Sequence, residues 1–523
     1  MPRFTLDGQE VEAAAGTTIL RAARERGLRI PTLCWDESVA PCTSCMVCVV
    51  RDARHGRLIP SCSYPVQDGL IIETGGEEVL RARREAIELL LSDHLGDCEA
   101  PCRRGCPAGV DVPRMLRFLR AGRPREALIE MKRALALPAT LGYICHAPCE
   151  KPCRRALHDG AVSIRLLRRH IAELDLACGA PWRPGIPPDN GRRIAIVGAG
   201  PAGLSAAWYL RQDGFGVRLF DEHDAPGGNV RRGVPEDRLP RAVLDAEIAL
   251  IGGLGIDWRL GARVGGAAAF DEIRSTHDAV IVATGACDAA VLAAWGLEQT
   301  GRGVRVDAAT RATSRAGVFA AGDVVQGARQ SVRSVAEGRE AARSAAAWAL
   351  TGKPATVRRR FNSRMGRLAP EELARFVADA SPAPRARKEG IDGLAPAEAL
   401  AEAARCLDCD CRKADGCALR DAADEYGAQA DAFRGEGRRP FERVDAHDEV
   451  VYESGKCIQC GLCVRIAEQY REPLGLAFVG RGFDVRIAVP FNEELRRGLT
   501  TAARECVRAC PTAALAFQRW PEC

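Results

Sequence analysis

The sequence lacks any uninterrupted run of about 18 uncharged apolar residues, the length that a membrane-spanning helix requires. It also lacks a tract rich in Lys and Arg with interleaved aromatic residues, and 74 basic against 69 acidic side chains leave a net charge of only +5. The opening letters MPRFTLDGQEVE do not show the charged-then-apolar order of a secretory signal. These absences predict a cytoplasmic location, no membrane span and no nucleic-acid partner.

Cysteine, by contrast, is abundant, because the 523 residues include 23 cysteines, mostly in tight clusters. A disulfide framework requires an oxidising compartment and small secreted domains, and nothing in the sequence indicates either. Clustered thiols in a large cytosolic chain indicate metal or iron–sulfur ligands instead. The length predicts about three or four domains.

The first ninety residues read as strand, turn, strand and an amphipathic helix that begins near Thr17. Thiols spread over loops with a C-x-x-C pair suit a [2Fe-2S] cluster, and zinc is the alternative. Two such pairs overlap, Cys42/Cys45 and Cys45/Cys48. The spacing C-x10-C-x2-C-x13-C resembles the [2Fe-2S] domain of the complex I large peripheral subunit and of related hydrogenase subunits. The resemblance leaves Cys42 spare and implies as ligands Cys34, Cys45, Cys48 and Cys62.

A second cysteine block consists of DHLGDCEAPCRRGCPAG and LGYICHAPCEKPC, which flank a stretch with helical periodicity. The C-P pair at 106–107 and the pattern C-x-A-P-C-E-x-x-C at 145–153 resemble the N-terminal domain of the glutamate synthase small subunit and its relatives, including dihydropyrimidine dehydrogenase. That domain holds two [4Fe-4S] clusters. By resemblance, one cluster takes Cys106, Cys145, Cys149 and Cys153.

The ligands of the other cluster are incomplete in this sequence. Cys98 and Cys102 are available, and His94 lies one residue from the place of the family's first cysteine. Imidazole can replace a thiolate on iron, although His94 also reads as a helix-end histidine with a local hydrogen bond. The family's Gln or Glu ligand falls near Arg168 or Arg169, and arginine cannot ligate. This cluster therefore uses His94 with an unidentified fourth ligand, or it does not form.

The stretch RRIAIVGAGPAGLSAAWYLRQDGFGVRLFDE reads as strand, Gly-rich turn, helix and second strand. Its G-x-G-x-x-G motif consists of Gly198, Gly200 and Gly203, which permit a tight turn, the approach of a pyrophosphate and close helix packing. Asp221 lies about twenty residues later, where an acid bonds ribose hydroxyls. The pattern predicts a Rossmann-like dinucleotide site.

FAD is favoured over NAD by a resemblance. PGGNVRRGVPEDRLP and GVFAAGDVVQGARQSVRSVAEGREAARSAA resemble the two FAD segments of the glutamate synthase small-subunit family, and DAVIVATGA closes the first half. The resemblance implies that Asp323 contacts the ribityl chain and that a helix from near Ser331 points toward the flavin ring. The predicted FAD residues are Gly198, Gly200, Pro201, Ala202, Gly203, Asp221, Glu222, Gly227, Gly228, Arg238, Ala283, Thr284, Gly285, Gly322 and Asp323.

A nicotinamide-binding domain is not expected. Between Gly285 and Gly322 there is no second G-x-G-x-x-G/A motif, and the roughly 100-residue βαβ domain that would carry one does not fit. GLEQTGRGVRVDAATRATSRAGVFAAGD matches the segment located directly after that domain in the family, so the excision lies near 286–295.

The C-terminal third carries two further cysteine motifs. CLDCDCRKADGC predicts one metal site, a [4Fe-4S] cluster with zinc as the alternative, from Cys406, Cys409, Cys411 and Cys417. KCIQCGLCVRIAEQY and ECVRACPTAALAF resemble two-cluster bacterial ferredoxins, but one ligand set is lost at Ala467, Thr500 and Ala503. One [4Fe-4S] cluster is expected, and Cys506 stays free. Its ligands are Cys457, Cys460, Cys463 and Cys510. The lone Cys178, Cys287 and Cys523 carry no motif.

The predicted fold class is a multidomain α+β and α/β chain. Its expected parts are a β-grasp [2Fe-2S] domain at 1–92, a helical [4Fe-4S] domain at 93–186, a Rossmann-like FAD domain without NAD(P) insertion at 187–352, a linker with the CxxCxCx5C motif at 353–445, and a ferredoxin-like domain at 446–523.

No nucleophile–base pair or acid/base dyad stands out, so no catalytic residue is predicted. The cofactors imply an oxidoreductase with FAD, one [2Fe-2S] and two to four [4Fe-4S] clusters. The hypothesis is an electron-transfer subunit of a formate dehydrogenase-, hydrogenase- or NADH-oxidoreductase-like complex. Its partners would be an NADH:FMN-type subunit, a catalytic dehydrogenase subunit, or a ferredoxin. The alternatives are a self-sufficient NAD(P)H oxidoreductase and a non-catalytic scaffold with structural FAD.

Overall fold

The computed structural model describes residues 1–327, 330–356, 360–388, 390–433, 435, 441–444 and 446–518. The chain forms two compact units. One, here called the flanking unit, comprises Met1–Glu99, Arg360–Arg375 and Asp410–Cys523; the other, the inserted unit, comprises Ala100–Arg359 and Phe376–Cys409. The residues of the predicted linker at 353–445 are divided between the two units, and the linker stays a prediction. In the described part of the chain, no helix is both long and apolar enough to span a membrane.

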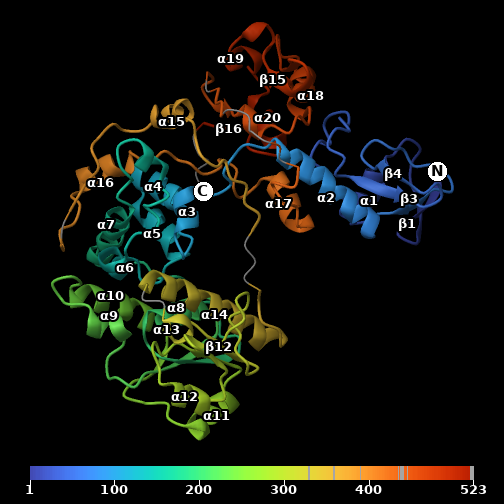
Figure 1. Cartoon of the computed structure of the whole chain (residues 1–523). Helices are drawn as coiled ribbons and strands as arrows, with labels where there is room; N and C mark the ends of the chain where they lie inside the picture. The colour runs from blue at the N-terminus through green and yellow to red at the C-terminus, as the bar shows by residue number, and fades with distance from the viewer. Residues whose placement is uncertain are drawn as a thin grey trace. The chain divides into compact units, whose positions relative to one another are not determined.

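The N-terminal part of the flanking unit is a mixed five-stranded sheet in the order β2-β1-β5-β3-β4 (Figure 1). Strands β1 and β2 form a hairpin closed by Asp7 and Gly8, both with positive φ, as a two-residue hairpin turn requires. Helix α1 begins after Thr18, whose hydroxyl accepts from the Arg21 backbone N–H. These elements are β1 Arg3–Leu6, β2 Gln9–Glu12, α1 Ile19–Glu25, β3 Val49–Asp52, β4 Arg57–Pro60 and β5 Ile71–Glu73.

The rest of the flanking unit is built from short elements around two further apolar cores. One core joins α2 to α17 and includes thiols from both ends of the sequence. The other lies between α18, α20 and the β13–β16 pair. The elements are α2 Glu77–Ser92, α15 Pro370–Val377, α17 Ala418–Tyr426, β13 Val450–Tyr452, α18 Leu462–Gln469, β14 Ala477–Val479, β15 Arg486–Ala488, α19 Leu495–Gly498, α20 Ala503–Ala509 and β16 Leu515–Phe517.

The inserted unit opens with short helices whose apolar faces share one core. Asp111 caps α4 by accepting from the Arg114 backbone N–H, and a proline lies in the first turn of α4, α5 and α6. The pattern predicted from helical periodicity is therefore confirmed. The helices are α3 Pro101–Gly105, α4 Val112–Arg120, α5 Pro124–Lys132, α6 Pro138–Ile144, α7 Ile164–Ala177 and, from the later segment, α16 Pro396–Ala403.

A parallel five-stranded sheet in the order β12-β9-β6-β7-β8 comes next in the same unit. Along β6, Ile194 and Ile196 belong to the core that includes α8 and α14, whereas Ala195 and Val197 belong to the core under α11 and α12. Figure 1 shows the two helix layers on either side of this sheet. The strands are β6 Arg193–Val197, β7 Gly216–Phe220, β8 Asp257–Arg259, β9 Ala279–Val282 and β12 Val318–Ala320. The mixed α/β class with a parallel sheet is thus confirmed.

The connections of this sheet carry the remaining elements. They are α8 Pro201–Gln212, α9 Gly228–Gly233, α10 Arg241–Gly252, α11 Ala267–Thr276, α13 Asp323–Gln326 and α14 Ser331–Thr351. Between β9 and β12, where the excision is predicted, the chain is described throughout and forms α12 Ala289–Ala294 and the hairpin β10 Gln299–Thr300 with β11 Gly303–Val304.

Candidate functional site

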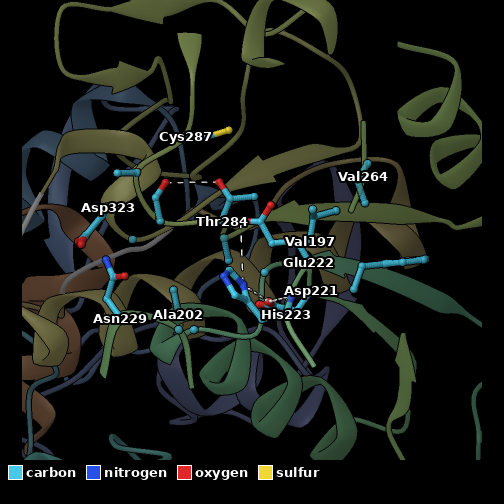
Figure 2. A pocket seen from close by; sticks show the side chains of 18 of the residues that line it. Val197, Ala202, Asp221, Glu222, His223, Asn229, Val264, Thr284, Cys287 and Asp323 are labelled. Carbon is cyan, nitrogen blue, oxygen red and sulfur yellow. Dashed lines mark hydrogen bonds and ion pairs between the residues drawn. The ribbon is translucent and has the colours of Figure 1, made fainter. Parts of the chain in front are cut away.

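A cavity of about 300 Å³ lies at the carboxyl ends of the parallel strands, the place where this class of sheet binds ligands (Figure 2). Most of the predicted FAD residues line it. They are Gly198, Gly200, Pro201, Ala202, Asp221, Glu222, Gly228, Ala283, Thr284, Gly285, Gly322 and Asp323. Gly203 and Gly227 are not among the lining residues, and Arg238 lines a different cavity.

The glycine motif shapes the turn that enters the cavity. Gly198 has a φ of +111°, and a Cβ there would lie 2.4 Å from the Ala283 carbonyl oxygen. A Cβ on Gly203 would lie 1.9 Å from the Gly198 carbonyl oxygen, so α8 can approach β6 only through glycine. The N-terminus of α8 therefore opens on the cavity with unpaired backbone N–H groups, a suitable place for a pyrophosphate.

Asp221 is fixed by the backbone rather than left free. Its Oδ2 accepts from the Ala199 N–H at 2.7 Å, and its Oδ1 accepts from the His223 N–H at 2.9 Å. In Figure 2, Asp221 and His223 lie together, joined by dashed lines, while Cys287 lies away from them across the pocket. A carboxylate held at the end of β7 suits the ribose contact predicted from the sequence.

Several lining residues were missed by the sequence interpretation. They come from the loops after β7, β8 and β9 and from α9, namely His223, Asn229, Arg263, Val264, Cys287 and Asp288. These residues could have been predicted from the rule that ligands bind at the carboxyl ends of neighbouring parallel strands. Their residue types carry no motif of their own.

A second, smaller cavity of about 150 Å³ brings a thiol toward the dinucleotide site. It is lined by Cys145 and His146 from the end of α6, by Val234 and Arg238 after α9, and by Ser331 from the first turn of α14. Helices α9 and α14 also supply residues to the larger cavity, among them Asn229 and Ser334. The two cavities have no lining residue in common, but the first turn of α14 supplies residues to both.

The four predicted N-terminal thiols come together in the flanking unit. The Cys34 sulfur is hydrogen-bonded by Cys45 and Cys62, which lowers the pKa of Cys34 to about 2. A hydrogen bond from Cys62 likewise lowers the pKa of Cys48 to about 7. All four are buried. Cys42 is not one of these hydrogen-bonded thiols: burial and the nearby Cys34 raise its pKa, while Arg465, within hydrogen-bond reach, acts to lower it.

Replacing Cys45 by serine is expected to abolish the [2Fe-2S] signal of the reduced protein in electron paramagnetic resonance (EPR) spectra, because one of four ligands is lost. The matched change Cys42→Ser should leave that signal intact, since Cys42 interacts with Cys34 but takes no part in the hydrogen bonds that join Cys34, Cys45 and Cys62. The comparison measures signal intensity per chain in both variants. Loss of the signal in Cys42→Ser with retention in Cys45→Ser would contradict the assignment.

The predicted C-terminal thiols also converge. Cys457, Cys460, Cys463 and Cys510 all line one cavity of about 20 Å³. Cys506 is buried beside it, and its thiol donates to the Cys463 carbonyl oxygen at 3.6 Å. The expected ligand set and the spare thiol are thus placed as the sequence suggested. Cys523 lies outside the described residues.

The thiols of the helical domain are grouped differently from the prediction. Cys106, Cys145 and Cys149 interact with one another and with Arg168, a residue of α7. Burial acts to lower the pKa of Arg168, but the nearby Cys145, Cys149 and Cys106 raise it. Cys153 is not among the main interaction partners of Arg168 or Cys149.

Cys153 instead joins a set that sequence spacing could not identify. The strongest interactions of Cys102 are with Cys406 and Cys409, and those with Cys153 and Cys149 come next. Cys406 and Cys409 reach this set because the segment Phe376–Cys409 folds back onto the inserted unit. The prediction that Cys153 shares a cluster with Cys106 stays a prediction; Cys153 interacts with Cys102, and about 250 residues separate Cys153 from Cys406.

The set around Cys98 lies in the flanking unit. Ser363 donates its N–H to the Cys98 sulfur at 3.4 Å, and Cys98 interacts with Cys411 and Cys417. Cys406 and Cys409 thus interact with Cys102, whereas Cys411 and Cys417 interact with Cys98, and the prediction that these four cysteines form one site stays a prediction. The predicted pairing of Cys98 with Cys102 likewise stays a prediction; the boundary between the two compact units falls after Glu99.

His94 is buried near the Cys98 set. A Cβ on Gly96 would lie 3.6 Å from His94 Nε2 and 3.1 Å from Lys456 Cε. Lys456 in turn interacts with Cys411, and its pKa is raised because Glu453 and Cys411 outweigh the effect of burial. His94 therefore lies near Gly96 and Lys456, and Lys456 interacts with Cys411, a member of the Cys98 set.

Among the described residues, no three His, Cys, Asp or Glu side chains converge closely enough to hold a single metal ion. A cluster with several iron atoms does not require such convergence, because its thiolates bind different irons. The donor sets do fit clusters chemically, since each combines three or four cysteines that are buried or partly buried.

Three family models match parts of the chain. They are a 2Fe-2S iron-sulfur cluster binding domain at residues 2–77, the dihydropyrimidine dehydrogenase domain II with a 4Fe-4S cluster at residues 92–179, and an NAD(P)-binding Rossmann-like domain at residues 196–252. The first two cover the predicted [2Fe-2S] ligands and the cysteines from Cys98 to Cys153. The third covers the glycine motif and the strand, helix and strand around it.

The chain is also similar to curated proteins. It is 37% identical over 207 residues to the NADP(+)-dependent formate dehydrogenase subunit beta of Moorella thermoacetica, covering 36% of this chain and 29% of the relative. It is 34% identical over 191 residues to the NADPH-Fe(3+) oxidoreductase subunit beta of Geobacter sulfurreducens, covering 36% and 28%. It is 32% identical over 209 residues to the NAD-dependent dihydropyrimidine dehydrogenase subunit PreT of Escherichia coli, covering 39% and 49%.

The chain thus matches between 28% and 49% of the length of these three relatives. All three are subunits of oxidoreductases by name. Together with the family models, they confirm the predicted resemblance of this chain to FAD- and iron–sulfur-containing oxidoreductases with a [2Fe-2S] N-terminal domain.

Proposed function

We propose that the chain is an iron–sulfur flavoprotein subunit that relays electrons between partner subunits of a multi-subunit oxidoreductase of the formate dehydrogenase, hydrogenase or NADH-oxidoreductase type. The observation that carries the proposal is the cavity that Cys145 shares with Ser331 at the N-terminus of α14. It puts a thiol set next to the end of the dinucleotide cavity at which a flavin ring would lie. A flavin can exchange two electrons with one partner and pass them singly to clusters.

Each thiol set supplies the residues that would hold one group. A [2Fe-2S] cluster would take Cys34, Cys45, Cys48 and Cys62. One [4Fe-4S] cluster would take Cys457, Cys460, Cys463 and Cys510, and a second would take His94, Cys98, Cys411 and Cys417. A third [4Fe-4S] cluster would take Cys102, Cys153, Cys406 and Cys409. His94 enters because imidazole can stand in for a thiolate on iron. We also propose that the N-terminal domain is a β-grasp domain, that the domain after it is helical and that the C-terminal domain is ferredoxin-like. A cytoplasmic location is part of the same proposal.

FAD would occupy the larger cavity. Its pyrophosphate would lie at the N-terminus of α8, beside Gly200, and its ribose beside Asp221. FAD is preferred to a nicotinamide because Gly322 and Asp323, which come after β12, line the same cavity. The chain's own groups bind and orient the cofactor and exclude water; no side chain is assigned a proton-transfer step.

The test is anaerobic reduction of the purified chain, monitored by flavin absorbance. Dithionite is expected to bleach the flavin fully, whereas NADH or NADPH alone should leave it oxidised over the same period. Adding a partner that oxidises NADH through FMN should restore reduction. Direct bleaching by NAD(P)H would replace the proposal with a self-sufficient oxidoreductase, and a flavin inert to dithionite would replace it with a scaffold.

A further inference from the structure

Arg168 is a buried cation that faces a set of thiols. Its side chain is 2% exposed, and one guanidinium nitrogen donates to the Leu141 carbonyl oxygen at 2.7 Å. Its Nε has no hydrogen-bond partner among the described residues. An unpaired N–H at this depth costs about 1–3 kcal/mol, so an acceptor is expected beside it.

The groups around Arg168 are sulfurs. Cys145 is within hydrogen-bond reach of the guanidinium, and Cys149 and Cys106 interact with it electrostatically. The three thiols are buried at the ends of α3 and α6 and in the loop after α6. All three interact with Arg168 of α7, so they can bind one group together.

No carboxylate among the described residues completes this set. Glu150, next to Cys149, is already engaged, because its Oε1 accepts from the Arg165 N–H at 2.9 Å and its Oε2 accepts from Arg385 at 2.5 Å. Arginine itself carries five N–H donors and no acceptor, and it stays protonated in proteins. The set therefore offers three ligands and one permanent positive charge.

We propose that Cys106, Cys145 and Cys149 hold a three-iron [3Fe-4S] cluster, and that Arg168 donates hydrogen bonds to its sulfides where the ligand of a fourth iron would stand. A guanidinium repels a fourth iron cation but attracts sulfide, and charge-assisted hydrogen bonds are the strong ones. The same positive charge favours the reduced cluster, which raises its potential. This inference depends on one part of the proposed function, namely that the thiol sets hold iron–sulfur clusters.

The experiment is EPR of the whole protein, purified anaerobically and oxidised with the mild oxidant thionine, because ferricyanide itself can strip iron from [4Fe-4S] clusters. Oxidised [2Fe-2S] and [4Fe-4S] clusters are diamagnetic, whereas an oxidised [3Fe-4S] cluster has one unpaired electron, so its signal is selective. The wild-type chain is expected to give close to one such spin per chain. Cys149→Ser should abolish this signal and leave the reduced [2Fe-2S] signal unchanged.

The variant Arg168→Glu supplies an oxygen ligand and removes the cation. With Fe²⁺ and dithionite, one iron and one electron are added, which converts [3Fe-4S]⁺ to [4Fe-4S]²⁺. The three-iron signal should then be lost in Arg168→Glu and should persist in Arg169→Gln, a change of the neighbouring buried arginine, which pairs with Glu173.

The outcomes separate the two proposals. A wild-type chain that shows its reduced clusters but no three-iron signal overturns the assignment at Arg168 and leaves the relay intact. A chain with no iron–sulfur signal in either state overturns both. If Arg168→Glu fails to fold, the wild-type and Cys149→Ser spectra decide alone.

Discussion

Replacing Gly200 by alanine is expected to abolish flavin binding without unfolding the protein. A Cβ at this position would meet only the Gly228 Cα, at 3.8 Å, so the empty fold tolerates it. The same Cβ would project from a residue that lines the dinucleotide cavity at the N-terminus of α8. It would therefore occupy the place where a pyrophosphate must approach the backbone.

The affinity for FAD is expected to fall by at least about 100-fold, which corresponds to about 3 kcal/mol. The measurement is flavin content after gel filtration together with the melting temperature of the flavin-free protein. Gly265→Ala is the matched control, since a Cβ there has no atom within 4 Å and Gly265 does not line the cavity. Full flavin content in Gly200→Ala would show that the cofactor binds elsewhere.

The second large effect is expected on replacing Arg405 by methionine. Arg405 is fully buried, donating to Glu402 Oε1 at 2.9 Å and to Asp159 Oδ1 at 2.8 Å. Glu402 also accepts the N–H groups of Ser163 and Ala386. Removing the cation leaves a buried carboxylate without its charge partner, which costs about 3–5 kcal/mol.

The loss matters for function because Arg405 directly precedes Cys406. Without this anchor, Cys406 and Cys409 should no longer be held beside Cys102, and the iron content should fall along with the free energy of unfolding. Denaturant unfolding and iron analysis measure the two effects. Arg305→Met is the control, because its pair with Glu298 is 3.8 Å long and exposed, and such pairs contribute about 0–1 kcal/mol. An equal effect in both variants would refute the role of the buried network.

The sequence by itself determined the parts whose residues are near neighbours along the chain. Gly198 and Gly200 line the dinucleotide cavity, and the structure brings together the predicted N-terminal thiols and the predicted C-terminal thiols, because local backbone geometry and short spacings fix these segments. Helical periodicity likewise predicted α4, α5 and α7. The same local logic explains why the parallel sheet could be expected from alternating strands and helices.

Only the tertiary structure decided which distant thiols meet. CLDCDCRKADGC reads as one site, yet its first two cysteines join Cys102 and Cys153, and its last two join Cys98. The spacing of cysteines along the sequence cannot reveal these pairings. The chain leaves a unit and returns some 300 residues later, so the packing of distant segments brings these thiols together. The interruption of the flanking unit by the inserted unit is the physical reason.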